Sequence, residues 1–224
     1  MIPGFMRRRR GFGDRSIDIQ PSRTADILTI LNAGWYRILA RPEVSPAACE
    51  VELTGHLRVG MIAAVNARVV RCHKRISIQA GTETFFGTDV VPSGLTDISI
   101  HLRDIRERTL DHGPHALIEC KRIAGGDAPL CRLYVVEGLD RFTSGKYAGR
   151  QTVAFMAGYV LSGSVGAAAD GINRYLLRQG RDAEHLRSCT VVAAAWARSS
   201  RHPRLPPAMP IDLHHAFLTF QTVP

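Results

Sequence analysis

Apolar and polar residues alternate along two short runs in the middle of the chain, and this alternation predicts two β-strands. The runs cover residues 95–102 and 116–123. Since side chains alternate between the two faces of a strand, Asp97 lies opposite the apolar face of the first strand, and Glu119 and Lys121 lie opposite that of the second. If the strands are neighbours, these three side chains converge. The apolar positions are Ile98, Ile100 and Leu102 in the first strand, and Ala116, Ile118 and Cys120 in the second.

Helical spacing upstream predicts a helix whose inward face carries Leu53, Leu57, Met61 and Ala64, with Ser45 as its N-cap and Pro46 in its first turn. Glu50 falls on this inward face, and Glu52 on the other side of the helix. A buried acid is costly unless it is paired or binds a metal, whereas an acid near a helix N-terminus is favoured by the dipole. Both interpretations of Glu50 stay open. If the phase of the helix differs from this prediction, Glu52 rather than Glu50 is the acid on the inward face.

The rest of the pattern predicts one α/β domain over residues 24–224, with a central mixed sheet flanked by helices. Residues 1–23 contain four consecutive arginines and predict a flexible basic arm. The further elements expected are a helix at 25–39, a hairpin of strands 75–78 and 83–86, helices at 130–142 and 167–178, a strand or helix at 153–160, and strands at 190–196 and 211–220.

Charge and composition narrow the class of protein. The formal net charge is +9 and the pI is about 9.9, which favour a polyanionic partner, with nucleic acid first and an anionic membrane surface second. No apolar run approaches the roughly 20 residues that a membrane span needs. Five scattered cysteines favour a reducing compartment over a disulfide framework. With no signal-peptide pattern at the start, we expect a cytoplasmic protein.

The acidic residues and the lysine together resemble the restriction-endonuclease-like superfamily of nucleases, whose signature is Pro-Asp followed by Asp/Glu-x-Lys. Asp97 matches the first acid, and Glu119-Cys120-Lys121 matches the second element. Thr96 stands where the signature has proline. The resemblance covers roughly residues 45–220, and the segments around Tyr134–Gly138 and Met156–Val160 look like those of uncharacterised bacterial members, some of them near restriction or anti-phage genes.

The resemblance implies a restriction-endonuclease-like fold and metal-dependent hydrolysis of DNA phosphodiester bonds, in bacterial restriction or antiviral defence. Asp97 and Glu119, with Glu50 from the helix, would hold Mg²⁺, for which Mn²⁺ can substitute. Lys121 would orient or deprotonate the attacking water or stabilise the developing charge. A homodimer and an operon-encoded partner protein are further expectations.

Basic residues in the second half of the chain are candidates for contacts with nucleic acid: Arg141, Lys146, Arg198, Arg201 and Arg204. Arg141 and Lys146 are interleaved with aromatic residues, and the last three form a predicted basic loop. Two alternatives stay open. One is a nuclease that acts on RNA, and the other is a non-catalytic, basic nucleic-acid-binding or assembly subunit.

Overall fold

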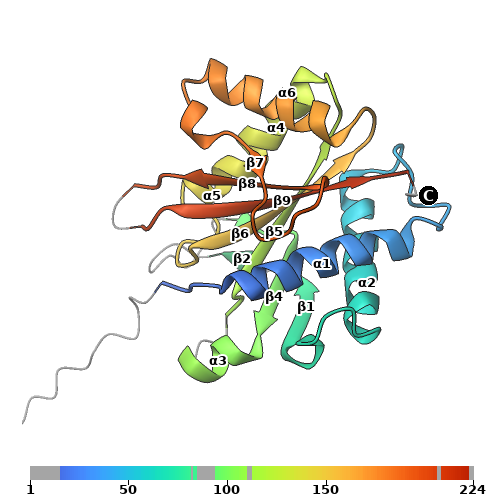
Figure 1. Ribbon diagram of the computed structural model, residues 1–224, viewed down its shortest axis with the longest axis vertical. Helices are drawn as coiled ribbons and strands as arrows, with labels where there is room; N and C mark the ends of the chain where they lie inside the picture. Colours follow the sequence, from blue (N-terminus) through green and yellow to red (C-terminus); the bar gives the residue numbers. More distant parts are fainter. Residues whose placement is uncertain (1–15, 82, 85–93, 110–112, 206–207, 222–224) are drawn as a thin grey trace, which may run out of the picture.

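A mixed sheet of seven strands runs through the computed structural model of the protein, with helices on both of its faces (Figure 1). The structure describes residues 16–81, 83–84, 94–109, 113–205 and 208–221. A single α/β domain with a central mixed sheet flanked by helices is thus confirmed. In spatial order the strands are β1 (Ile76–Ala80), β4 (Ile98–Leu102), β5 (Ala116–Ile123), β6 (Val153–Val160), β9 (Ile211–Thr219), β8 (Ala197–His202) and β7 (Arg187–Ser188), and β2 (Glu83–Thr84) pairs with β3 (Gly94–Leu95) separately.

The direction of the strands divides the sheet into three parts. β1, β4 and β5 are antiparallel neighbours, and β5, β6 and β9 are parallel. β8 runs antiparallel to β9, and β7 runs antiparallel to β8. A parallel pair needs a crossover, and β5 reaches β6 through α4 (Ala128–Tyr134), a π-helical turn η2 (Val135–Leu139) and α5 (Asp140–Thr143). This crossover lies over the face that carries Glu119 and Lys121.

Two apolar clusters cover the two faces of the sheet. The first contains the predicted apolar positions of β4 and β5, packed against α1 (Pro21–Ile38) and α2 (Glu50–Asn66). The second lies under α4, α5 and α6 (Val165–Arg178). The predicted apolar faces of both strands are therefore confirmed, since their aliphatic residues share the first cluster while Glu119 and Lys121 point to the other side. The first strand begins at Ile98 rather than at Leu95, which belongs to β3, so Asp97 lies just before the strand instead of on it.

Helices α1 and α2 approach each other closely because glycines meet where they cross. A Cβ added to Gly60 would lie 2.2 Å from the carbonyl oxygen of Gly34, and one added to Gly34 would lie 2.6 Å from the backbone nitrogen of Met61. Side chains at either position would force the helices apart. The contact fixes α2, and with it the N-terminal residue Glu50.

Several predicted elements are wrong. The helix α2 begins at Glu50, not near Ser45, because Cys49 acts as N-cap and the Glu52 carboxylate accepts a hydrogen bond from the backbone N–H of Cys49 at 3.0 Å. The predicted hairpin does not form, since β1 pairs with β4, which lets Ile76 join the first cluster. Residues 190–196 form no strand, and the predicted basic loop contains strand β8.

The elements outside the sheet complete the picture. A short helix, α3 (Arg103–Thr109), lies between β4 and β5. The short turn η1 (His73–Arg75) directly precedes β1, and the short turn η3 (Asp182–Glu184) lies just before β7. Of the predicted basic arm, residues 1–15 lie outside the described residues, while Ile17 and Ile19 are buried. Among the described residues, no helix combines the length and the apolarity needed to cross a membrane.

Candidate active site

Four side chains from three elements meet beside β5. Asp97 directly precedes β4, which pairs with β5 through Ile98 and Ile118. Glu119 and Lys121 lie two residues apart on β5 and so share a face. Glu50 is the first residue of α2 and reaches the same place from the helix N-terminus. The predicted convergence of Asp97, Glu119 and Lys121 is thus seen in the fold, and Glu50 rather than Glu52 joins them. We call these four residues the acid–lysine cluster.

Glu119 is fully buried, and its two carboxylate oxygens have different surroundings. Oε1 accepts from Lys121 Nζ at 3.0 Å and from Arg141 Nη1 at 2.7 Å. Oε2 is buried without a hydrogen-bond partner among the described residues. Burial, followed by the charge of Asp97, raises the pKa of Glu119 to about 7 despite the two cations. Oε1 is therefore paired with two cations of the protein, and Oε2 is a buried acceptor without a partner among the described residues.

Lys121 lies between two carboxylates. Its ammonium donates to Glu50 Oε1 at 2.7 Å as well as to Glu119, and the lysine is 8% exposed. Burial alone would lower the pKa of Lys121, but the charges of Glu119 and Glu50 outweigh it and raise the pKa above the usual value. The side chain is therefore an ammonium at neutral pH, a donor of hydrogen bonds rather than a base.

The other two acids are oriented by the backbone of β5. Asp97 Oδ2 accepts from the N–H of Cys120 at 2.7 Å, and Glu50 Oε2 accepts from the N–H of Arg122 at 3.0 Å. Burial raises the pKa of Asp97, and this hydrogen bond opposes the rise. These contacts hold both acids against the strand that carries Glu119 and Lys121.

Arg141 and Tyr147 complete the surroundings of Glu119. Arg141, on α5, donates to the hydroxyl oxygen of Tyr147 at 3.0 Å as well as to Glu119. The buried Tyr147 in turn donates to the carbonyl oxygen of Leu95 at 2.6 Å, two residues before Asp97. Tyr147 therefore links the segment that carries Asp97 to the guanidinium that holds Glu119.

The crossover comes close to Lys121 because Gly138 in η2 has no side chain. A Cβ there would lie 3.2 Å from Lys121 Cγ and 2.6 Å from Met156 Cε. The stem of the lysine is thereby confined between the sheet and the π turn, which restricts the positions that the ammonium can take.

The cluster offers oxygen ligands but no complete cage for a metal. No group of three or more His, Cys, Asp or Glu side chains in the described part of the chain is arranged to hold a metal ion. Asp97 and Glu119 are the two carboxylates best suited to a cation, because Glu50 is engaged by Lys121 and by the backbone of β5. The unpartnered Oε2 of Glu119 fits a hard cation such as Mg²⁺, which binds through one or two carboxylates and keeps several waters.

The basic residues predicted to contact nucleic acid do not come together in one place. Arg141 belongs to the acid–lysine cluster, and Lys146 is exposed. Arg198 donates to two carbonyl oxygens of its own segment, and Arg201 pairs with Asp212 at 3.2 Å. Arg204 donates to the carbonyl oxygens of Ala148, Gln151 and Met209. Their roles toward nucleic acid stay predictions.

A second polar network, which sequence reasoning missed, crosses the buried side of β8 and β9. The hydroxyl of Ser200 lies 2.6 Å from His202 Nε2 and 2.8 Å from His215 Nε2. The chain continues from His215 Nδ1 to the hydroxyl of Tyr134 at 3.0 Å, and from His202 Nδ1 to Glu184. Only a period of two at 200 and 202 hinted that these side chains share a face.

The network ends on the crossover that carries Arg141. Glu184 accepts from Arg181 Nε at 2.9 Å and from Nη2 at 2.7 Å, and Arg181 Nη1 pairs with Asp140 at 2.7 Å. Asp140 immediately precedes Arg141 on α5, a helix of four residues. The ion pairs of Arg181 therefore help to hold the short helix that brings Arg141 to Glu119.

No family model, curated protein or solved structure matches the chain.

Proposed function

We propose that this protein is a metal-dependent nuclease that hydrolyses phosphodiester bonds of DNA, and that it serves bacterial restriction or antiviral defence. The observation that carries the proposal is the acid–lysine cluster itself. Asp97 from the residue before β4, Glu119 and Lys121 from the adjacent β5 and Glu50 from a helix N-terminus form one group, in which one carboxylate oxygen of Glu119 is buried without a partner among the described residues. The cluster lies beside an antiparallel β1–β4–β5 unit that continues into a parallel β5–β6 pair, an arrangement consistent with the restriction-endonuclease-like fold.

Asp97 and Glu119 would hold Mg²⁺, with Oε2 of Glu119 as one ligand. When bound, the ion would lower the pKa of a water and neutralise charge on the reacting phosphate. Arg141 donates to Oε1 of Glu119, so Oε2 would be the oxygen available to a cation. The Nζ proton of Lys121 stays on the lysine, and the ammonium would donate to the attacking water or to a phosphate oxygen, where charge develops.

Glu50 then has the role of a positioning acid. By accepting from Lys121 Nζ and from the backbone of β5, it sets the distance of the ammonium from Glu119. Removing Glu50 would leave Lys121 free to collapse fully onto Glu119, and we expect lower activity with the fold intact.

Cleavage of a supercoiled plasmid with Mg²⁺ tests the proposal. We expect wild-type protein to cleave, and Asp97→Asn, Glu119→Gln and Lys121→Ala to lose at least about 100-fold in rate. Glu137→Gln is a matched control, because Glu137 is exposed on η2, and it should cleave as wild type does. A wild type that binds DNA but never cleaves it with Mg²⁺ or Mn²⁺ contradicts the proposal. An RNA substrate in the same assay distinguishes the RNA-directed alternative.

One observation favours the alternative of a non-catalytic nucleic-acid-binding subunit. Lys121 and Arg141 already compensate Glu119 and Glu50 within the protein, so the cluster is also consistent with a structural ion-pair network. In that case Glu119→Gln would reduce stability and leave any nucleic-acid binding unchanged, and no metal would bind.

A further inference from the structure

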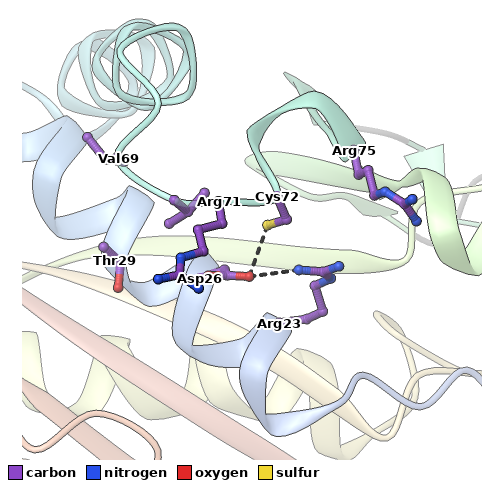
Figure 2. A pocket seen from close by; sticks show the side chains of 8 residues that line it. Arg23, Asp26, Thr29, Val69, Arg71, Cys72 and Arg75 are labelled. Carbon is purple, nitrogen blue, oxygen red and sulfur yellow. Dashed lines mark hydrogen bonds and ion pairs between the residues drawn. The ribbon is translucent and has the colours of Figure 1, made fainter.

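Two basic hollows adjoin at the end of the molecule formed by α3, the start of β1 and the connection that precedes it. The larger, of about 640 Å³, is lined by residues of α1 and of the segment 69–75 (Figure 2). The smaller, of about 170 Å³, lies between η1, β1 and the start of α3. Arg75 lines both. We use the name arginine strip for the cations that line these hollows on the β1 and α3 side: Arg71, Lys74, Arg75, Arg103 and Arg106.

The carboxylates near the strip are already engaged. Asp26 and Asp104 both accept from Arg23, at 2.9 and 3.1 Å. Figure 2 shows Arg23 and Asp26 joined on α1, with the thiol of Cys72 directed to the same carboxylate, at 2.9 Å. Arg23 therefore has a structural role, since it forms ion pairs with both Asp26 and Asp104.

Four of the five cations of the strip have no such partner. Arg103 pairs with Glu107 at 2.8 Å. The other four, Arg71, Lys74, Arg75 and Arg106, are exposed and form no ion pair with any described residue. In Figure 2, Arg71 extends from the connection after α2 towards α1, over the larger hollow. Uncompensated like charges repel one another, so an anionic ligand would relieve an unfavourable arrangement.

The strip lies at the far end of β4 from the acid–lysine cluster. Asp97 precedes β4 and Arg103 follows it, and five residues of strand span about 17 Å. This distance excludes direct participation of the strip in the chemistry at Glu119. It corresponds to several phosphates along a nucleic-acid strand.

We propose that the arginine strip binds the sugar-phosphate backbone of nucleic acid, as a second contact remote from the acid–lysine cluster. Guanidinium groups match phosphate oxygens with paired donors. A membrane surface fits less well, because an interfacial site needs apolar anchors, and none of the exposed large hydrophobic residues in the described chain lines either hollow. The choice of nucleic acid as the polyanion rests on the proposed function, but the test does not depend on cleavage.

Binding of a fluorescein-labelled DNA duplex of about 30 base pairs, followed by anisotropy in EDTA over a range of salt concentrations, tests the proposal. The variant is Arg71→Gln with Arg75→Gln. The matched control is Arg132→Gln with Arg178→Gln, two exposed arginines of α4 and α6 on the other face of the sheet, which removes the same charge. We expect the strip variant to bind about tenfold more weakly at 0.1 M salt. We also expect the negative slope of the logarithm of the association constant against the logarithm of the salt concentration to become less steep, by about 1 to 2.

Each other result is informative. Equal weakening by the control pair, or unchanged binding by the strip variant, overturns the proposal. So does binding of wild type to anionic vesicles that the strip variant loses while its DNA binding is unchanged. Because EDTA prevents metal-dependent cleavage, a strip variant with weakened binding supports the strip even if the plasmid assay contradicts the nuclease.

Discussion

Glu184 lends itself to a quantitative test of the buried network, because its environment predicts how stability changes with pH. Burial alone would raise its pKa, but hydrogen bonds with His202 and Arg181 more than offset this and lower the pKa to about 2, against an ordinary value of 4.5. A carboxylate whose pKa is lower in the folded state stabilises the protein above its unfolded pKa. That stability is lost as the pH falls through the folded pKa.

The perturbation is Glu184→Gln, which keeps the shape and removes the charge. A fall in the pKa of Glu184 from 4.5 to about 2 corresponds to at most about 3 kcal/mol at neutral pH. The measured difference is smaller, because solvent screens a carboxylate that is partly exposed and because the glutamine retains some hydrogen bonds. Urea unfolding of wild type and variant between pH 7 and pH 2 measures the difference in the free energy of unfolding. We expect nearly the full difference above about pH 5, about half of it near pH 3, and only about an eighth of it near pH 2.

Asp182→Asn is the matched control, because Asp182 lies in the same turn, η3, and is exposed. It should change the free energy of unfolding by less than about 0.5 kcal/mol at any pH. A difference between wild type and Glu184→Gln that stays constant from pH 7 to pH 2 would refute the reasoning, since it would show that the charge of Glu184 is not what stabilises the fold.

Further predictions concern the surroundings of the acid–lysine cluster. Gly138→Ala should lower the free energy of unfolding in urea by about 1 to 3 kcal/mol and slow plasmid cleavage, because its Cβ would crowd Met156 and Lys121. The control is Gly55→Ala on α2, whose Cβ meets nothing within 4 Å and which should raise the free energy of unfolding by up to about 1 kcal/mol. Equal effects of the two substitutions would count against the crowding. Tyr147→Phe should lower the free energy of unfolding in urea by about 1 kcal/mol, because Arg141 and the carbonyl oxygen of Leu95 each lose a hydrogen-bond partner. An unchanged free energy of unfolding would mean that water replaces the hydroxyl without penalty. Arg181→Gln should slow plasmid cleavage without touching Glu119, and cleavage at the wild-type rate would show that α5 keeps Arg141 in place unaided.

The strands that carry the cluster could be predicted from sequence because their chemistry is local. Period-two alternation assigned the faces of β4 and β5 correctly, and the assignment needed no knowledge of distant partners. The apolar positions of α2 were also predicted correctly from helical spacing, whereas its start was not. A Ser-Pro pair is a strong local signal for a helix start, but a capping box formed by Cys49 and Glu52 determines where α2 begins.

Contacts between residues far apart in sequence were beyond the reach of local patterns. Arg141 looked like a contact for nucleic acid, but the crossover brings it to Glu119, 22 residues earlier in the chain. Strand β8 was taken for a loop because its exposed arginines hide the buried Ser200 and His202, which are satisfied only by the distant His215 and Glu184. The pairing of β1 with β4 likewise depends on Ile76 joining a core that forms from the whole chain.

The most direct test of the central claim is a crystal structure of the wild-type protein grown with Mn²⁺, examined by anomalous diffraction. The account predicts a peak in contact with carboxylate oxygens of both Asp97 and Glu119, with Oε2 of Glu119 as a ligand and Lys121 still paired with Glu50. A structure without a peak there, in which Lys121 and Arg141 alone neutralise Glu119, would contradict it.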